Sequence, residues 1–119
     1  MKLEPGTRVA GPVVTGLAPT GFRIDRGEPV PAVLLAPEWW RPWDGVLSAA
    51  ALKPLAALAP EFILLGTGGC LVRPPRDLVA ALEAQGVGIE SMDSRAAARA
   101  WGVLRGEGRW IAAALMALT

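Results

Sequence analysis

The sequence contains no histidine and a single cysteine, Cys70, among its 119 residues. Without histidine the commonest general base is missing, and so is every Ser-His or Cys-His nucleophile pair. The usual zinc and transition-metal sites are excluded for the same reason, and a lone cysteine cannot form a disulfide within the chain. We therefore expect a protein that is not an enzyme, needs no metal or other cofactor, and is compatible with a reducing compartment.

The chain also lacks a surplus of charge of either sign. Its 12 Lys and Arg residues nearly balance its 11 Asp and Glu residues, which leaves a net charge of +1. The arginines are spread along the sequence and form no basic block. Such a distribution gives no electrostatic attraction toward phosphates, so we expect no nucleic-acid partner.

Long hydrophobic runs are missing as well. The start of the chain, "MKLEPGTRVAGPVV", has Glu and Pro-Gly where a signal peptide needs an unbroken apolar core. Later apolar stretches are interrupted well short of a membrane span. With 52% hydrophobic and 19% charged residues, we predict one folded domain over residues 1–119, cytoplasmic and without membrane insertion. Some apolar surface should remain for a protein partner or a homodimer.

The first third of the sequence favours strands and turns. Residues 22–24 alternate apolar and polar side chains, as in a strand with one solvated face. The following "DRGEP" predicts a hairpin turn in which Gly27 takes a positive φ. The run 30–35 is the expected return strand. Pro29 and Pro31 restrict its beginning to a sheet edge or a bulge, because proline cannot donate to the ladder.

Three tryptophans follow within five positions, in the segment "APEWWRPWDGV". Its two prolines predict a loop. One interpretation is a lid that packs Trp39, Trp40 and Trp43 onto the core. The other is an aromatic interaction surface, because tryptophan beside arginine, here Arg41, is the composition of binding hot spots.

The remainder of the chain predicts alternating helices and strands. A helix capped by Ser48 should end before Pro60, and the internal Pro54 should kink it or divide it into two short helices. A strand at 62–65, a helix at 75–85, a strand at 87–92 and a helix up to residue 106, capped by Asp93 or Ser94, follow, and 109–117 fits either a strand or a terminal helix. This order indicates an α/β fold, with a mixed, mostly parallel sheet covered by helices and an N-terminal antiparallel hairpin.

A glycine-rich loop, "GTGG", leaves the strand at 62–65. A phosphate-binding P-loop needs G-x-x-x-x-G-K-[ST], and no lysine follows Lys53. A dinucleotide-binding G-x-G-x-x-G is incomplete because Leu71 stands in the third glycine position. The glycines therefore indicate a sharp turn out of a buried strand and not a nucleotide site.

Ligands of α/β sheets bind beyond the carboxyl ends of the strands, where neighbouring loops diverge. The loops after residues 65 and 92 should therefore meet in a shared hollow. An anionic metabolite would suit the N–H groups at the start of the following helix. Plainer roles stay open: helix capping for Asp93 and Ser94, a solvated charge for Arg73, and core filling for Cys70. The candidate ligand-binding residues are Gly66, Thr67, Gly68, Arg73, Asp93 and Ser94.

Two stretches together carry a family resemblance. "ILLGTGG…PP" at 63–75 and "GVGIESMDSRAAARAWGVLRGEGRWIAAALM" at 86–116 resemble the Mth938-like domain family, also called Xcc1710-like or DUF498. In that family a strand ending Leu-Gly-Thr-Gly precedes a proline and a helix. A second strand ends Met-Asp-Thr before an alanine-rich helix and a Glu-Gly-Arg turn. The resemblance implies a three-layer α/β domain with a mixed sheet.

The resemblance also implies a function in binding. Members are largely of unknown biochemical function, and the best-described branch resembles a mitochondrial complex I assembly factor, which binds other proteins. Here Ser94 replaces the usual threonine, and Ala98, Trp101 and Gly102 replace residues that are commonly Cys, Tyr and Asn. The missing thiol and amide speak against chemistry on this helix. We thus predict a non-catalytic, assembly-factor-like binding module, with anionic-metabolite binding as the alternative.

Overall fold

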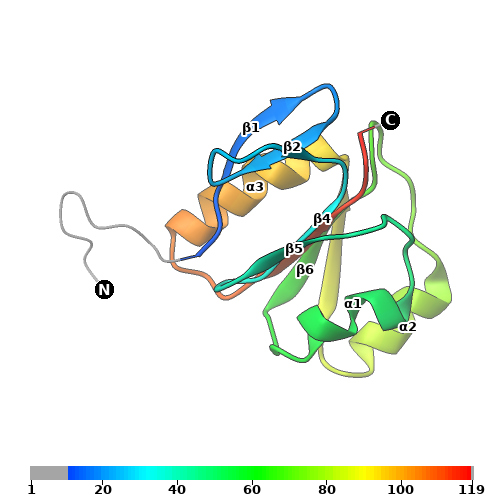
Figure 1. The fold of residues 1–119 in the computed structure, drawn as a ribbon. Helices are drawn as coiled ribbons and strands as arrows, with labels where there is room; N and C mark the ends of the chain where they lie inside the picture. The colour runs from blue at the N-terminus through cyan, green and yellow to red at the C-terminus, as the bar shows by residue number, and fades with distance from the viewer. Residues whose placement is uncertain (1–10, 119) are drawn as a thin grey trace.

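The computed structural model describes residues 11–118, so most of the stretch compared with a signal peptide lies outside it. Within these residues no helix is long and apolar enough to cross a membrane. The elements, in chain order (Figure 1), are β1 (Val14–Ala18), β2 (Gly21–Ile24), β3 (Pro29–Val30), β4 (Val33–Leu35), β5 (Trp40–Pro42), α1 (Ala49–Ala56), β6 (Phe62–Gly66), α2 (Arg76–Glu83), β7 (Gly88–Met92), α3 (Ser94–Gly106) and β8 (Ala112–Leu115).

The strands form two sheets. The first is a small antiparallel sheet in the order β1-β2-β3, and the second has five strands in the order β5-β4-β8-β6-β7. In the larger sheet β6 pairs parallel with β7 and β8, whereas β4 pairs antiparallel with β5 and β8. The predicted mixed sheet is therefore confirmed. The ambiguous segment 109–117 contains its central strand, β8.

Alternating side chains of the larger sheet build two cores. In β6, Ile63 and Leu65 face one cluster of buried residues, while Leu64 faces another. Figure 1 shows α1 and α2 on one side of this sheet and α3 with the small sheet on the other. This arrangement gives three layers. It also explains the unbroken apolar run of β6, because a strand covered on both faces has no solvated side.

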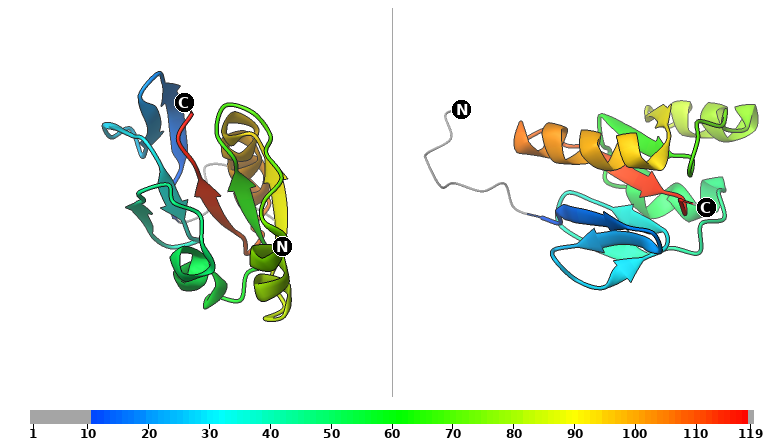
Figure 2. Two further views of the ribbon diagram at one scale, coloured as in Figure 1. Left: turned by 90° about the vertical axis from the view of Figure 1, so that its right-hand side faces the viewer. Right: turned by 90° about the horizontal axis from the view of Figure 1, so that it is seen from above.

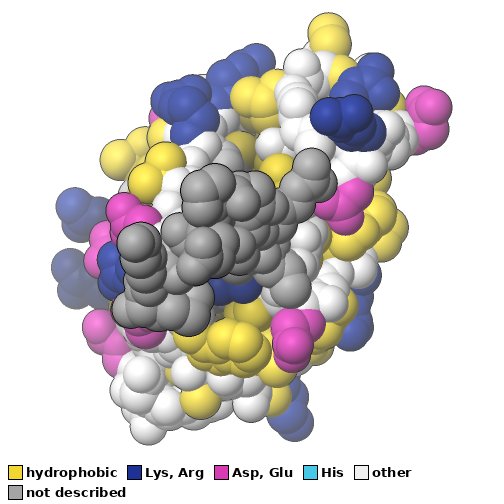
Figure 3. All heavy atoms as spheres, turned by 90° about the vertical axis from the view of Figure 1, so that its left-hand side faces the viewer, with side chains coloured by type: hydrophobic (Ala, Val, Ile, Leu, Met, Phe, Trp, Pro, Cys, Tyr) yellow, Lys and Arg dark blue, Asp and Glu magenta, His cyan; other side chains and the backbone are white. Residues whose placement is uncertain are grey.

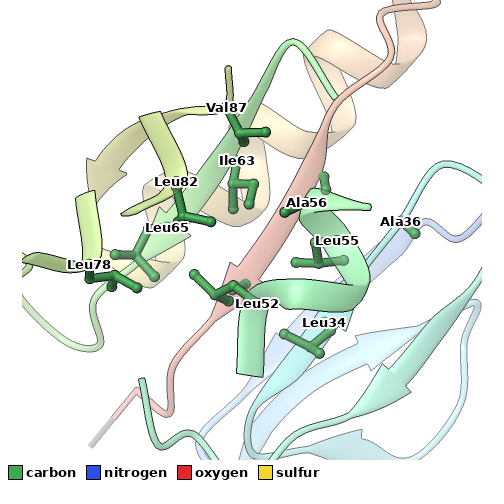
Figure 4. Packing of buried hydrophobic residues seen from close by; sticks show 12 residues of the cluster. Leu34, Ala36, Leu52, Leu55, Ala56, Ile63, Leu65, Leu78, Leu82 and Val87 are labelled. Carbon is green, nitrogen blue, oxygen red and sulfur yellow. The ribbon is translucent and has the colours of Figure 1, made fainter. Parts of the chain in front are cut away.

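The first core joins the sheet to α1 and α2. Figure 4 shows Leu52 and Leu55 of α1, and Leu78 and Leu82 of α2, gathered over the same sheet face. Full burial of each such leucine contributes about 1.5–3 kcal/mol relative to exposure. The members of this core are Leu34, Ala36, Leu52, Leu55, Ala56, Ile63, Leu65, Leu78, Leu82, Val87, Ala112 and Ala114.

The second core lies between the sheet, α3 and the small sheet. Its largest member, Trp101, is fully buried, and its indole Nε1–H donates to the C=O of Pro12 at 3.0 Å. This bond satisfies the one polar group of the ring and ties the start of the hairpin to α3. The members are Phe22, Ile24, Val33, Leu35, Leu64, Ala97, Ala98, Trp101, Ile111, Ala113 and Leu115.

Two helix starts follow the capping signals in the sequence. The N–H of Ala51 donates to Ser48 Oγ at 3.0 Å, and the N–H of Ala96 donates to Asp93 Oδ1 at 2.9 Å. Pro54 does not divide the first helix in two, because α1 continues through it as one helix of eight residues.

The front hairpin is present, but its turn differs from the prediction. Gly27 has no positive φ; Asp25 and Arg26 do, with φ of 51° and 66°. The N–H of Gly27 donates to the C=O of Ile24 at 2.9 Å, which makes these two the central residues of the turn. Positive φ at both central residues is typical of a type I′ β-turn, whose geometry matches the twist of the flanking strands.

Two further predictions at the front were wrong. The run 30–35 is not one strand, because β3 and β4 belong to different sheets and Pro31 lies between them. The tryptophan segment is not entirely loop, because β5 pairs with β4. Pro42 is tolerated there because β5 is an edge strand, which needs no N–H on its outer side.

Charges of both signs are interspersed on the face drawn in Figure 3. Lys and Arg side chains do not gather there into a single basic patch. Such a mixed surface gives no strong field of one sign.

Candidate functional site

The parallel pairing of β6 and β7 brings the two predicted loops to one edge of the sheet. Gly66 is paired with Met92, and the N–H of the next residue, Thr67, donates to the C=O of Met92 at 2.9 Å. Thr67 and Asp93 therefore lie at the same edge, each one residue beyond its strand.

The loops are joined by direct hydrogen bonds at this edge. The N–H of Gly68 donates to Ser94 Oγ and the N–H of Ser94 donates to the C=O of Gly68, both at 2.8 Å. The Ser94 hydroxyl in turn donates to the C=O of Met116 at 2.8 Å. Ser94 is fully buried, so a single side chain connects the ends of β6, β8 and α3.

The glycines allow this close approach. A Cβ added to Gly66 would lie 2.7 Å from Ser94 Oγ, and Gly68 has a φ of 103°. One position needs the space and the other needs the backbone freedom that only glycine has. The glycine loop is thus explained as a turn between a strand and a helix.

The Thr67 hydroxyl organises the rest of the loop. It donates to the C=O of Cys70 at 2.7 Å and accepts from the N–H of Val72 at 2.9 Å. This turn leaves the side chains of Cys70, Val72 and Arg73 exposed. The interpretation of Cys70 as a core-filling residue was therefore wrong.

Five of the six candidate ligand-binding residues lie together, and Arg73 lies on the exposed loop beside them. Four backbone N–H groups at this edge are already bonded within the protein: those of Thr67, Gly68 and Ser94 across the loops, and that of Ala96 to the Asp93 carboxylate. An anion at the start of α3 would also meet this carboxylate. Among residues 11–118 no group of three Cys, Asp or Glu side chains could hold a metal ion.

A groove of about 430 Å³ lies elsewhere, between β5 and α1. Trp43 lines this groove. Trp39 lies beside it and is stacked on Arg41, which also lines the groove. We call the groove together with Trp39 the tryptophan surface. The groove is lined by Leu34, Arg41, Pro42, Trp43, Asp44, Val46, Ser48, Ala50, Ala51 and Pro54.

The three tryptophans are half-buried. Trp39 and Trp43 pack against the core on the side of α1 and α2, and Trp40 packs against the other core. The Arg41 guanidinium lies 4.3 Å from the centroid of the Trp39 ring, a cation–π contact. The rings are thus anchored on the core and still present an exposed part, and their interpretation as an interaction surface stays a prediction.

Sequence reasoning missed Val46 and Pro54 in this groove. Val46 is 65% exposed, and its N–H donates to Asp44 Oδ1 at 2.9 Å in a turn that displays the side chain. Pro54 has no N–H to offer the C=O of Ala50, which costs the helix a hydrogen bond. The proline itself was visible in the sequence, but only the fold places it in the same groove as Val46.

Comparison with known proteins identifies relatives along nearly the whole chain. The model of a family described as a protein of unknown function (DUF498/DUF598) matches residues 14–116. An uncharacterized protein of Rhodobacter capsulatus is 38% identical over 113 residues, which are 95% of this chain and 90% of that protein.

Solved structures share the fold. The crystal structure of a Bordetella parapertussis protein is 33% identical, with a TM-score of 0.81, and the match covers 91% of this chain and 97% of that one. A solution structure from Bordetella pertussis, described as a Mth938-like domain, is 28% identical, with a TM-score of 0.81 and coverage of 99% and 93%. The fold predicted from the two sequence motifs is therefore confirmed.

Proposed function

Because the chain belongs to the DUF498 family and carries a grooved aromatic surface, we propose that it is a non-catalytic protein-binding module. In this role it binds a subunit of a larger protein assembly through the tryptophan surface. The observation that carries the proposal is the 65% exposed side chain of Val46 at a groove of about 430 Å³ that Trp43 also lines. The resemblance to an assembly-factor branch supports the same kind of role.

The composition of the tryptophan surface suits a binding hot spot. Tryptophan and arginine are the residues that most often contribute large binding energies at interfaces. Arg41 is stacked on Trp39, which orders a long side chain before a partner arrives and lowers the entropic penalty of binding. Val46 offers apolar area whose burial contributes about 25 cal/mol per Å².

The edge of β5 extends this surface. In the part of the chain that the structure describes, β5 has a hydrogen-bonded neighbour on one side only, β4. Pro42 takes one N–H donor away from this outer edge, so an extended segment of a partner would pair with only part of it. The groove holds a few side chains, and a stable interface covers about 800 Å² on each partner. We therefore expect the contact to include both the groove and this edge.

Binding of an anionic metabolite between the loops after β6 and β7 stays a prediction. Four backbone N–H groups at that edge, those of residues 67, 68, 94 and 96, are engaged by Ser94, Asp93 and neighbouring carbonyl groups. An anion would have to replace these bonds, and for that reason we favour the tryptophan surface.

The test compares two exposed valines. Val46→Asp places a charge at the groove, and Val72→Asp places the same charge on the loop after β6, where Val72 is 55% exposed. The full chain and both variants are used to capture proteins from an extract of the producing organism. Each captured protein is then purified, and its dissociation constant is measured by calorimetry.

The proposal expects a partner whose affinity falls at least roughly tenfold, equivalent to about 1.4 kcal/mol, with Val46→Asp. The same partner should bind Val72→Asp as it binds the unmodified chain. Equal affinities for both variants would contradict the tryptophan surface. Turnover of a small molecule by the purified chain would contradict the non-catalytic role.

A further inference from the structure

A second groove of about 430 Å³ lies between β1 and α3. The two elements pack against each other on the sheet face away from α1 and α2 (Figures 1 and 2). β1 is an edge strand of the small sheet, with β2 as its one hydrogen-bonded neighbour in the described structure. We call this feature the β1–α3 groove. It is lined by Val14, Thr15, Gly16, Leu17, Ala98, Arg99, Gly102 and Val103.

The groove combines residues with little or no side chain and exposed apolar ones. Gly16, Ala98 and Gly102 leave the space, while Leu17 is 42% and Val103 62% exposed. Val13, the residue before β1, is 48% exposed as well. Exposed apolar side chains gathered around a groove are typical of an interaction site, whereas isolated ones are not.

Gly102 is not required by the fold. It lies inside a helix of 13 residues, where glycine is about 1 kcal/mol less favourable than alanine. A Cβ added at this position would meet nothing within 4 Å. The glycine therefore keeps space free at the protein surface and not in the core.

The charge at the groove has one sign. Arg99 is the ionisable residue among those that line it, and Arg95 lies one helical turn earlier. Both side chains are exposed, and neither side chain has an ion-pair or hydrogen-bond partner within residues 11–118. Two arginines four residues apart on a helix repel each other. A partner with carboxylates would relieve this repulsion.

We propose that the β1–α3 groove binds a short acidic and apolar segment of a partner protein. One large apolar side chain fills the space over Gly102, between Leu17 and Val103. Carboxylates of the same segment pair with Arg95 and Arg99. This inference does not rest on the tryptophan surface, which lies across the sheet beside α1 and contributes none of these residues.

The probe is a library of random short peptides displayed on phage and selected on the full chain. Enriched peptides are synthesised with a fluorescent label, and their dissociation constants are measured by anisotropy. We expect Asp or Glu near a large apolar residue in the enriched sequences. Raising the salt concentration should weaken their binding, because exposed charge pairs are screened.

Three variants identify the site. Gly102→Leu fills the groove at an open helical position and should abolish peptide binding while its circular dichroism and melting temperature stay native-like. Arg99→Glu should weaken binding at least roughly tenfold, because attraction becomes repulsion. Val46→Asp, on the tryptophan surface, should leave the peptide affinity unchanged.

Several outcomes would overturn the inference. No enrichment of peptides, or enrichment without acidic residues, would remove the stated partner chemistry. Binding that survives in folded Gly102→Leu would place the peptide elsewhere, and loss with Val46→Asp would place it on the tryptophan surface. A dimer of the chain that Gly102→Leu disrupts would show that a second copy occupies the groove.

Discussion

Gly68 and Ser94 are joined by two hydrogen bonds, in which each residue donates its backbone N–H to the other. The N–H of Gly68 donates to Ser94 Oγ, and the N–H of Ser94 donates to the C=O of Gly68, each at 2.8 Å. Because Ser94 also donates to Met116, this pair joins the exits of two parallel strands to the end of a third. The place where α/β sheets often hold a ligand is here a connection within the protein.

Replacing Ser94 with alanine should be strongly destabilising. The N–H of Gly68 and the C=O of Met116 would each lose a buried partner, at about 1–3 kcal/mol per group. We expect the free energy of unfolding, measured in urea, to fall by about 2–6 kcal/mol. The control is Ser48→Ala, which removes an exposed helix cap at about 1 kcal/mol. A loss no larger than that of the control would contradict the role of Ser94.

Gly66→Ala and Gly106→Ala should change the stability of the fold in opposite directions or by different amounts. The new Cβ at position 66 would lie 2.7 Å from the Oγ and 2.9 Å from the Cα of Ser94, whereas at position 106 it meets nothing within 4 Å. We expect Gly66→Ala to cost about 1–3 kcal/mol through overpacking. Gly106→Ala should leave the unfolding midpoint unchanged or raise it. Similar unfolding midpoints for the two variants would show that the end of β6 can move away from Ser94 and make room for the new Cβ.

Glu61 should make stability depend on pH. Arg109 Nη2 donates to Glu61 Oε1 at 2.7 Å, and the N–H of Trp110 donates to Oε2 at 3.2 Å. The hydrogen bond from Arg109 is the main cause that lowers the pKa of Glu61 below its usual 4.5, against a smaller opposing effect of desolvation. The folded pKa is then lower than the unfolded one. The ionised Glu61 side chain therefore stabilises the fold at pH values above its unfolded-state pKa, and this stabilisation is lost as the pH falls through its folded-state pKa.

The measurement is the difference in unfolding free energy between the unmodified chain and Glu61→Gln across a pH series. This difference should favour the unmodified chain at neutral pH and shrink as the pH falls below 4.5. High salt should reduce it, because both side chains are partly exposed. A difference that does not change with pH would show that the carboxylate charge has no part in this contact.

Pro54→Ala should stabilise the fold and lower the affinity for the partner. Alanine supplies the N–H that the C=O of Ala50 lacks, and proline inside a helix is about 3 kcal/mol less favourable than alanine. The variant also removes apolar area from the groove of the tryptophan surface. We expect a higher melting temperature and a larger dissociation constant for the captured partner. Pro75→Ala, at the start of α2, should change neither by a comparable amount.

Local signals in the sequence predicted much of the fold. Ser48 was predicted as one cap and Asp93 or Ser94 as the other, and the alternation of strands and helices after residue 60 was correct, because these features depend on neighbouring residues. The position of β8 between β4 and β6 could not be read from its alanine-rich sequence. That strand is specified by its two neighbours and by the cores on both faces, which are contacts distant in the sequence.

In the candidate site, too, local features could be predicted from the sequence, whereas contacts between distant residues could not. The parallel strands allowed the convergence of Thr67 and Asp93 to be predicted, but the sequence could not show that the Ser94 hydroxyl turns inward and bonds both Gly68 and Met116. Nor could it place Val46 in one groove with Pro54, since that juxtaposition depends on how α1 packs beside β5.

Hydrogen–deuterium exchange of the full chain, with and without its purified partner, tests binding at the tryptophan surface most directly. Slower exchange on binding is predicted for the backbone of residues 40–53, which comprises β5 and most of α1. The loop at 69–73 should exchange at the same rate in both samples. Protection confined to that loop, or to β1 and α3, would contradict the proposed role of the tryptophan surface.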